Sequence, residues 1–419
     1  MRYDIITVGA GASGLLASIS ASEEGAKVLL IEKMNSEARK MLISGKGRCN
    51  ITNTAYQSDF FRKIYPKPKF LKHAFSSFFS KDIVKLLEEG GLKIKEERGG
   101  RVFPESDKAK DVVDTLLKIA KNKNVTIERH TKVIDVITEN NICKGVRVKN
   151  KEGKEHNIFS DSVILCTGGK SYPATGSTGD GYSLAKKLGH TVNFLHPALV
   201  PLIVEGNIAE MLQGLSLKNI KAILWVNGKK HREEFGEMLF AHFGLTGPVI
   251  LTLSRFAVKA LENQKKVEIS IDLKPALDEQ KLDNRLQREL NENGKKQIRN
   301  VMKNLLPSKL IPVILQLAET DGFKESNQVS AKERKKLRIL LKDFRFKITG
   351  HRGYKEAIVT AGGVDLNEID GKTMMSKIVK NLYFAGEIID ADAETGGYNF
   401  QIAFSTGWLA GKSAGKNLS

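Results

Sequence analysis

Apolar runs alternate with polar segments along residues 1–191 and predict strands and helices in turn. Tyr3–Val8 and Val28–Ile31 have the continuous apolar character of buried parallel strands, and residues 14–24 between them have the small side chains of a tightly packed helix. Residues 107–121 carry apolar side chains at helical spacing. The order strand, helix, strand predicts an α/β fold.

The pattern changes twice further along the chain. Three stretches predict a small β-meander, and a buried strand follows, ending in Thr167-Gly168-Gly169; these elements are residues 132–138, 143–148, 156–159 and 163–166. Residues 197–272 have the pattern of short strands with one helix after Pro248, residues 274–342 are polar and helical, and residues 344–348 predict a returning strand. We therefore predict three domains: a discontinuous one over 1–191 and 351–419, a β-rich insert over 192–273 and 343–350, and a basic helical insert over 274–342.

A glycine motif follows the first predicted strand, and an acidic residue ends the second. The glycines permit a tight turn and close approach of the backbone to a pyrophosphate, whose charge lies at the helix N-terminus. Glu32 can accept hydrogen bonds from ribose hydroxyls. The motif predicts a dinucleotide site, the alternative being a purely structural turn; its candidate contacts are Gly9, Gly11, Ala12, Ser13, Gly14 and Glu32.

A second motif near the other end of the chain distinguishes FAD from NAD. An FAD domain of the glutathione-reductase type uses a late strand that ends in Gly-Glu or Gly-Asp, and residues 384–390 fit that strand. We expect Glu387 or Asp390 to bind the ribityl chain and the N-terminus of a helix over Tyr398–Lys416 to face the flavin pyrimidine. The alternative is an ordinary helix-entry turn. The candidate contacts here are Gly386, Glu387, Asp390, Gly397, Tyr398, Asn399, Phe400 and Gln401.

The composition of the chain says little about its fold, but it bears on the binding partners and on the cellular compartment of the protein. The chain has 419 residues and a formal net charge of +19, which leaves a polyanionic partner open. Its three cysteines have no spacing typical of a disulfide framework or a metal site, so we expect a reducing cytoplasm and no metal. Met1 leads directly into a core strand and no apolar run has membrane-spanning length, so we expect no signal peptide and no membrane association.

The loop over residues 40–53 is the predicted wall of the active site. Gly45 and Gly47 let its backbone run against a cofactor, while Lys46 and Arg48 add positive charge. Arg48 would favour a thiolate at Cys49, or let Cys49 act as a proton donor near neutral pH. The alternative is that Cys49 is a packed small residue whose backbone N–H contacts the flavin.

Two histidines and two other cysteines are either functional or structural residues. His242, between two phenylalanines, is a candidate acid/base residue facing the pocket, the alternative being a core histidine. His196 is expected to be structural, Cys166 to lie in the core and Cys143 in a turn. No second GxGxxG follows a strand, so NAD(P)H is expected to bind transiently at the flavin face as the reductant.

Two segments concentrate basic residues, and both are candidate RNA-binding surfaces. Residues 60–79 combine five basic residues with seven aromatic ones, and residues 274–347 carry 18 Lys/Arg against 10 Asp/Glu. Basic side chains beside aromatic rings are typical of RNA recognition, because phosphates are neutralised and splayed bases stack. The alternative is that the phenylalanines are helix core and the lysines a solvated face.

The segment from Arg39-Lys40 through residues 44–53 (Ser-Gly-Lys-Gly-Arg-Cys-Asn-Ile-Thr-Asn) resembles the signature of the bacterial BaiN-like flavoproteins, also described as YhiN-type or aminoacetone-oxidase-type. The resemblance continues in residues 99–104, 196–202, 239–248, 359–364 and 395–399. It departs at Met375, where an acidic residue is expected, and at Glu394, where a glycine is expected. The resemblance implies a glutathione-reductase-type FAD-binding Rossmann-like domain interrupted by a β-barrel-like domain and a helical domain.

The same resemblance implies an FAD-dependent oxidoreductase that passes hydride from NAD(P)H through FAD to a uridine of large-subunit ribosomal RNA, forming dihydrouridine. The target base would have to leave its stack to reach the flavin. A small-molecule flavin oxidoreductase (an aminoacetone-type amine oxidase or an enone reductase) and a non-enzymatic assembly or redox-sensing factor remain alternatives, and the oligomeric state is left open. The further candidate cofactor contacts are Lys33, Lys40, Gly45, Gly47, Arg48, Asn50, Thr52, Val133, Thr167, Gly168 and Gly169.

Overall fold

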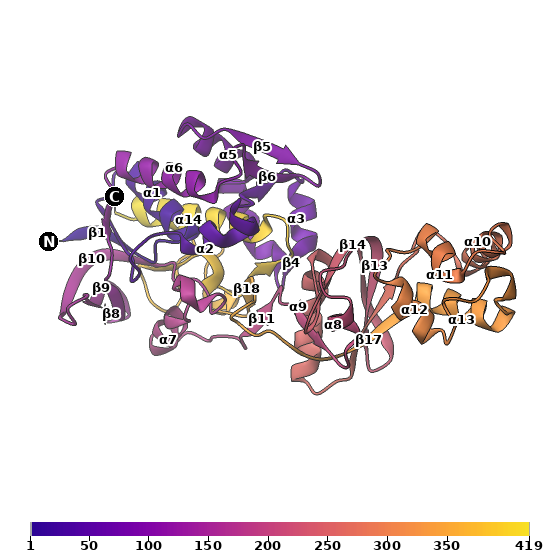
Figure 1. The fold of residues 1–419 in the computed structure, drawn as a ribbon. Coiled ribbons are helices and arrows are strands. Elements are labelled where there is room, and N and C mark those ends of the chain that lie inside the picture. Colours follow the sequence, from indigo (N-terminus) through magenta and orange to yellow (C-terminus); the bar gives the residue numbers. More distant parts are fainter. Residues whose placement is uncertain (1, 419) are drawn as a thin grey trace. The chain divides into compact units, whose positions relative to one another are not determined.

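A computed structural model describes residues 2–418 and divides the chain into two compact units (Figure 1). The first unit comprises Met1–Pro197 and Ala357–Ser419, and the second comprises Ala198–Glu356. Within the second unit one apolar core runs through both strands and helices. The predicted division of this part into a β-rich and a helical domain therefore remains a prediction.

A seven-stranded sheet forms the centre of the first unit. Its strands are β1 (Tyr3–Val8), β2 (Val28–Ile31), β7 (Thr126–Glu128), β8 (Lys132–Glu139), β9 (Ile142–Lys149), β10 (Glu155–Leu165) and β19 (Leu382–Phe384). Their order is β7-β2-β1-β10-β9-β8, with β19 paired to β10. The strands β1 and β2 run parallel, as predicted, and β7, β10 and β19 run parallel with them. The strands β8, β9 and β10 form the predicted meander.

Two strand predictions need correction. Residues 156–159 and 163–166 were expected to be separate strands, yet they belong to the single strand β10, which pairs first with β9 and then with β1. Polar Ser160 and Ser162 interrupt the apolar pattern but lie buried within the strand. The predicted strand over 384–390 ends at Phe384, because Gly386 takes a φ of +78° and starts a 3₁₀ turn, Gly386–Ile388.

The helices α1 (Ala12–Glu23) and α14 (Tyr398–Lys416) bring the two ends of the chain together (Figure 1). A Cβ at Gly407 would lie 2.2 Å from the carbonyl oxygen of Ser13, and one at Gly411 would lie 2.1 Å from that of Ala17. Glycine at these positions therefore permits close helix packing. The other helices and short strands of this unit are α2 (Arg39–Ile43), α3 (Gln57–Lys63), α4 (Lys72–Ser77), α5 (Ser80–Glu89), α6 (Ala109–Asn122), α7 (Asp180–Lys187), β3 (Thr52–Asn53), β4 (Ile64–Tyr65), β5 (Ile94–Glu97), β6 (Arg101–Pro104), β18 (Val359–Ala361) and β20 (Asp392–Ala393).

The aromatic residues of segment 60–79 pack inside the first unit. Phe60, Phe75 and Phe78 are buried, and Phe60 contacts Phe75, Phe79 and Tyr398 edge to face. The prediction that these phenylalanines stack on RNA bases is therefore wrong, because their rings are buried in the hydrophobic core. The basic side chains of the segment are a separate matter.

A closed barrel forms the first part of the second unit. Its strands are β12 (Leu202–Val204), β13 (Ser216–Val226), β14 (Lys229–Ala241), β15 (Gly244–Thr246), β16 (Val267–Asp272) and β17 (Phe344–His351), in the order β12-β15-β14-β13-β16-β17. The strands β13 and β14 form a hairpin far longer than the short strands predicted, whereas β17 and the helix after Gly247 are confirmed. The helices are α8 (Ile208–Met211), α9 (Pro248–Glu262), α10 (Glu279–Glu292), α11 (Ile298–Val301), α12 (Ile311–Leu317) and α13 (Ala331–Lys342). The strand β11 (His196–Ala198) lies at the boundary of the units.

Among residues 2–418 no helix is both long and apolar enough to cross a membrane.

Candidate functional site

The three glycines of the N-terminal motif have different surroundings. A Cβ at Gly9 would lie 2.6 Å from the carbonyl oxygen of Cys166, and one at Gly14 would lie 1.9 Å from that of Gly9. A Cβ at Gly11, by contrast, would find nothing within 4 Å. Gly9 and Gly14 therefore serve the packing of the turn, while Gly11 borders open space.

This open space lies at the N-terminus of α1. Gly11 is the N-cap residue, no side chain caps the helix, and its first turn contains no acidic residue. The backbone N–H groups are thus available to an anion. Glu32 lies beside the turn, where its two carboxylate oxygens accept hydrogen bonds from the backbone N–H of Ala10 (2.9 Å) and of Met34 (2.8 Å). Each oxygen has further acceptor capacity for a hydroxyl group.

The N-terminal and C-terminal motifs meet at Gly386. A Cβ there would lie 2.4 Å from Oγ of Ser13, and the Gly386 backbone N–H donates to Oγ1 of Thr406 at 3.0 Å. Ala12 and Ser13 are buried in the first turn of α1. The structure thus brings together two motifs that the sequence separates by about 370 residues.

The signature loop meets the start of α14 in the same region. A Cβ at Gly397 would lie 2.4 Å from the carbonyl oxygen of Thr52. The Thr52 hydroxyl donates to Oε1 of Gln401 at 2.6 Å, and the Asn50 amide, in the orientation that satisfies both its ends, accepts from the Gly397 N–H at 3.0 Å. These predicted contact residues are therefore neighbours in the structure.

The signature loop turns through left-handed backbone conformations. The φ angles are +57° at Gly45, +60° at Lys46, +83° at Gly47 and +60° at Cys49. Gly47 borders open space, whereas a Cβ at Gly45 would lie 3.2 Å from the backbone nitrogen of Asn50. The loop thus exposes backbone on the side of Gly47.

The expectation of a thiolate at Cys49 is wrong, whereas its role as a proton donor remains a prediction. The side chain is fully buried, and burial raises the pKa of its thiol to about 12 despite a hydrogen bond with Ser44. The thiol is therefore neutral near pH 7, which agrees both with a packed side chain and with a proton donor, and its backbone N–H donates to the carbonyl oxygen of Ser44 at 3.1 Å. Cys166 is buried as expected, but Cys143 lies buried in β9 rather than in a turn.

Arg48 does not activate the neighbouring thiol either. Its guanidinium forms ion pairs with Glu97 and, at 3.0 Å, with Asp107, and it lies 4.0 Å above the ring of Phe103. These partners fix the side chain in place. Arg48 contributes a positioned positive charge to the loop, and its role in catalysis remains a prediction.

A polar network joins four separate segments around Glu387. Lys40 Nζ donates to Oε2 of Glu387 at 2.7 Å, and Oε1 accepts from the Ser171 hydroxyl (2.7 Å) and the Thr360 N–H (2.8 Å). Burial by itself would raise the pKa of Glu387, but the Lys40 ammonium and the hydrogen bonds hold it below its ordinary value. The carboxylate is thus ionised and already engaged, so its predicted bond to the ribityl chain remains a prediction.

The glycine turn after β10 packs against this network. Gly168 has a φ of +71°, and a Cβ at Gly169 would lie 2.5 Å from Oγ1 of Thr360. Oγ1 of Thr167 is buried without a hydrogen-bond partner among the residues that the structure describes. Ser171 and Thr360 were not predicted as site residues, although Thr360 lies in one of the segments that carry the family resemblance.

Several other predicted contacts use their side chains within the protein. Lys33 Nζ donates to Asp180 at 2.7 Å, Asp390 accepts from Asn193 at 2.8 Å, and the Asn399 amide bonds the backbone of residue 393. Val133 is buried in β8, the Tyr398 ring packs on Phe60, and Phe400 stacks on Phe404 at 6.1 Å. Cofactor contacts from these residues remain predictions and would come from backbone groups or unused acceptor positions.

Glu394, at the position where the resemblance leads us to expect glycine, uses its side chain for two contacts. Its carboxylate accepts from the Tyr65 hydroxyl at 3.0 Å and pairs with Lys63 at 3.1 Å. Glu394 thereby ties the segment after α3 to the loop that precedes α14.

The two histidines belong to different environments. His242 lies in the turn between β14 and β15 of the second unit, is exposed, and contacts Phe243 edge to face at 5.0 Å. Its predicted position facing the pocket and its acid/base role remain predictions. His196 is buried, as expected of a structural residue.

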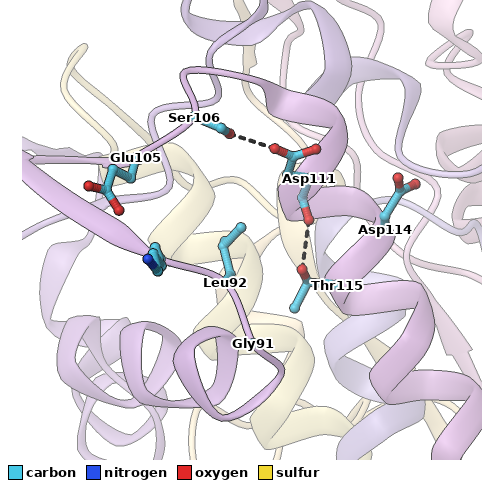
Figure 2. A pocket seen from close by; sticks show the side chains of 8 residues that line it. Gly91, Leu92, Glu105, Ser106, Asp111, Asp114 and Thr115 are labelled. Atoms are coloured by element: carbon cyan, nitrogen blue, oxygen red, sulfur yellow. Dashed lines mark hydrogen bonds between the residues drawn. The ribbon is translucent and has the colours of Figure 1, made fainter.

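An open cavity of about 540 Å³ lies elsewhere in the first unit (Figure 2). Figure 2 shows Ser106 and Asp111 pointing toward each other, and their side chains form a 2.5 Å hydrogen bond. The lining residues are Gly91, Leu92, Lys93, Glu105, Ser106, Asp111, Asp114 and Thr115. None of them belongs to the motifs described above.

Comparison with known proteins identifies the family. The family model of the HI0933-like protein Rossmann domain matches residues 3–413. The chain belongs to this family. It is 32% identical over 408 residues to a protein of Escherichia coli (strain K12) named ribosomal RNA dihydrouridine synthase, with 97% of this chain and 96% of that protein covered. It is 29% identical over 409 residues to the 3-dehydro-bile acid delta(4,6)-reductase of Clostridium scindens, covering 97% and 98%.

Solved structures share the fold at low sequence identity. A 3-ketosteroid-delta4-(5alpha)-dehydrogenase from Rhodococcus jostii RHA1 has a TM-score of 0.51 at 14% identity, with 99% of this chain and 97% of that chain covered. A flavocytochrome c3 fumarate reductase has a TM-score of 0.50 at 18% identity, covering 99% and 78%. The fold is thus that of a flavoprotein oxidoreductase with a Rossmann-type FAD-binding domain.

The residues present fit an FAD. The open space at Gly11, the uncapped N-terminus of α1 and the carboxylate of Glu32 are groups that a pyrophosphate and a ribose require. The signature loop also contains left-handed backbone and open space at Gly47, and it contacts the start of α14 through Thr52 and Gly397. A flavin-dependent activity is therefore consistent with both the geometry and the family.

Proposed function

We propose that this protein is an FAD-dependent reductase that uses NAD(P)H and converts a uridine of large-subunit ribosomal RNA to dihydrouridine. The observation that carries the proposal is the 32% identity, over nearly the full length of both chains, to the ribosomal RNA dihydrouridine synthase of E. coli. A second relative with that name, from Haemophilus influenzae, is 28% identical over 97% of this chain. The proposal places the protein in the cytoplasm, where ribosomal RNA lies.

In this proposal the chain's own residues bind and orient, and bound FAD supplies hydride transfer. The N–H groups of α1 and the space at Gly11 would hold the pyrophosphate, and Glu32 would accept from a ribose hydroxyl. The Glu387 carboxylate holds the ammonium of Lys40 within the site. Arg48, His242 and Cys49, the last as a buried and neutral proton donor, stay as candidate catalytic residues.

A small-molecule enone reductase is the second candidate. The relative named 3-dehydro-bile acid delta(4,6)-reductase favours it, because it covers 97% of this chain at 29% identity. Both reactions add hydride to a carbon–carbon double bond conjugated to a carbonyl, so the flavin site alone does not distinguish them.

Mass spectrometry of nucleosides from large-subunit ribosomal RNA tests the proposal. We expect dihydrouridine to disappear in cells without the gene and to return with the wild-type gene but not with Gly11→Val. Purified protein with NADH or NADPH should then restore dihydrouridine to RNA from the deletion strain. Unchanged dihydrouridine in the deletion strain would reject the RNA substrate, and reduction of steroid enones by the same preparation would support the second candidate.

A further inference from the structure

A group of exposed lysines from two distant segments forms one surface of the first unit, which we call the cationic face. It consists of Lys67, Lys69, Lys72, Lys372 and Lys377, all of them exposed. Lys67 Nζ donates to Oδ1 of Asn367 at 2.8 Å, and Lys377 Nζ donates to the carbonyl oxygen of the same residue at 2.9 Å. Two ammonium groups therefore converge on one asparagine.

The remaining lysines join the same surface through the backbone. A Cβ at Gly371 would lie 3.1 Å from the carbonyl oxygen of Phe70, so the turn at residues 370–373 packs directly on the segment between Lys69 and Lys72. Lys372 follows Gly371 in this turn. The cationic face is thus built by contact between residues 67–72 and 367–377.

The acidic residues of this surface use their carboxylates to accept hydrogen bonds from the backbone and from a hydroxyl group and do not bond the lysines directly. Asp365 accepts from the backbone N–H of residue 367, and Asp370 accepts from that of residue 372 and from the Thr373 hydroxyl. Glu368 accepts from the Thr191 N–H at 2.8 Å. Within residues 2–418, no lysine of the cationic face forms an ion pair with a carboxylate.

The basic cluster of the helical insert differs in this respect. On α13, Lys336 pairs with Glu319, Arg334 pairs with Asp283 at 3.3 Å, and Arg338 lies 3.8 Å from the same aspartate. Three of its five basic side chains are thus held by carboxylates. Lys332 and Lys335 remain exposed on this helix.

The segment that leads into the cationic face packs against the start of α14. The strand β4, two residues before Lys67, pairs with β20 in the loop before α14, and Phe60 contacts the Tyr398 ring at 4.7 Å. The ion pair between Lys63 and Glu394 adds a third link. The cationic face therefore begins two residues after a strand that lies beside the predicted cofactor contacts at the start of α14.

We propose that the cationic face is the surface that binds the phosphate backbone of the RNA substrate, in preference to the basic cluster on α13. This inference rests on the proposed function. Exposed ammonium groups without carboxylate partners can exchange their counterions for phosphates, which makes the affinity dependent on salt. The cationic face positions the strand, and the base that reacts is selected at the flavin site.

Two matched double variants test the inference. Lys69→Gln/Lys72→Gln removes two charges from the cationic face, and Lys332→Gln/Lys335→Gln removes two from α13. The probe is protein-free large-subunit ribosomal RNA from a strain without the gene, and the measurement is the dissociation constant over a range of KCl concentrations. Retained flavin absorbance and an unchanged melting temperature show that each variant is folded.

We expect the first variant to bind about tenfold more weakly and to lower the log–log salt slope by about 1.4, as two lost phosphate contacts on single-stranded RNA require. The second variant should change affinity less than about threefold. An unchanged affinity in the first variant with a loss in the second would overturn the inference while leaving the proposed function intact. Salt-independent or absent binding by the wild-type protein would overturn both.

Discussion

The two units of this protein differ in how the chain assembles them and in one feature of each, a glycine turn at a helix N-terminus in the first and a filled barrel in the second. The first unit is assembled from both ends of the chain, and its glycine turn leaves open space at Gly11 where α1 begins. The second unit is contiguous, and its barrel is filled by side chains, with Phe240, Phe344 and Phe346 in mutual contact at 4.6–6.5 Å between ring centroids. An interior that is filled with side chains is a packed core, so the flavin is expected in the first unit.

The chain offers separate probes for the two units. Its two tryptophans are Trp225 in the second unit and Trp408 in the first, and all three cysteines lie in the first. Fluorescence of single-tryptophan variants and thiol labelling can therefore follow each unit on its own.

The largest effect is expected from Gly11→Val. A side chain there enters the open space at the N-terminus of α1, so the variant should fold but lose essentially all bound FAD. Flavin absorbance of the purified protein and circular dichroism measure the two effects. Gly14→Val is the contrasting variant: its Cβ would lie 1.9 Å from the Gly9 carbonyl oxygen, so the fold itself should fail. A yellow Gly11→Val protein would refute the cofactor assignment.

Phe240→Ala should destabilise the second unit by about 3–5 kcal/mol, because it leaves a cavity among buried aromatic rings. Denaturant unfolding followed by Trp225, in a Trp408→Phe background, measures this loss. The transition followed by Trp408 in a Trp225→Phe background should move far less. If both transitions shift together, the two units unfold as one cooperative body and the contrast between them is wrong.

Glu387→Gln should cost about 3 kcal/mol of stability, because it leaves the Lys40 ammonium without its carboxylate in a partly buried site. The pKa of Glu387 is lower in the folded state than in the unfolded chain. Its ionised carboxylate therefore stabilises the fold at a pH above the ordinary carboxyl pKa, and this stabilisation is lost as the pH falls through the lowered pKa. The variant should therefore lose less stability on acidification than the wild type does. A double-mutant cycle with Lys40→Met measures the interaction free energy between the two side chains. Additive effects would show that the ion pair does not stabilise the fold.

The smallest effect is expected at the cysteines. Burial raises the pKa of Cys49 and Cys166 to about 12 and that of Cys143 to about 11, so native protein should react with iodoacetamide only very slowly near neutral pH. Labelling should accelerate when the first unit unfolds and should not respond to Phe240→Ala. Rapid labelling of native Cys49 would restore its predicted reactivity.

Part of the candidate site could be predicted from local sequence. The glycines of the first turn follow from the strand and helix that flank them, because only a particular backbone geometry joins those two elements around a phosphate. The late flavin motif was recognised, but its strand was predicted too long, since Gly386 adopts a positive φ that apolar periodicity does not reveal. The bonds of Glu387 to Ser171 and Thr360 were missed, because its partners lie 216 and 27 residues away.

The basic segments also separate what the local sequence predicts from what only the tertiary structure shows. The sequence placed lysines beside phenylalanines at residues 60–79, a pattern compatible with either RNA stacking or helix core. The structure buries Phe60, Phe75 and Phe78 and leaves Lys69 and Lys72 exposed. It also adds Lys372, 300 residues further along the chain.

By itself, the sequence determined the α/β class, the flavin-type motifs at both ends and the family, because these depend on local periodicity and on short spacings. Tertiary structure alone decided that Cys49 is buried and neutral, that Glu387 is engaged by Lys40, and that lysines of two distant segments share one surface. The physical reason is that burial, ion pairing and surface charge are set by neighbours in space. In this fold those neighbours come from opposite ends of the chain.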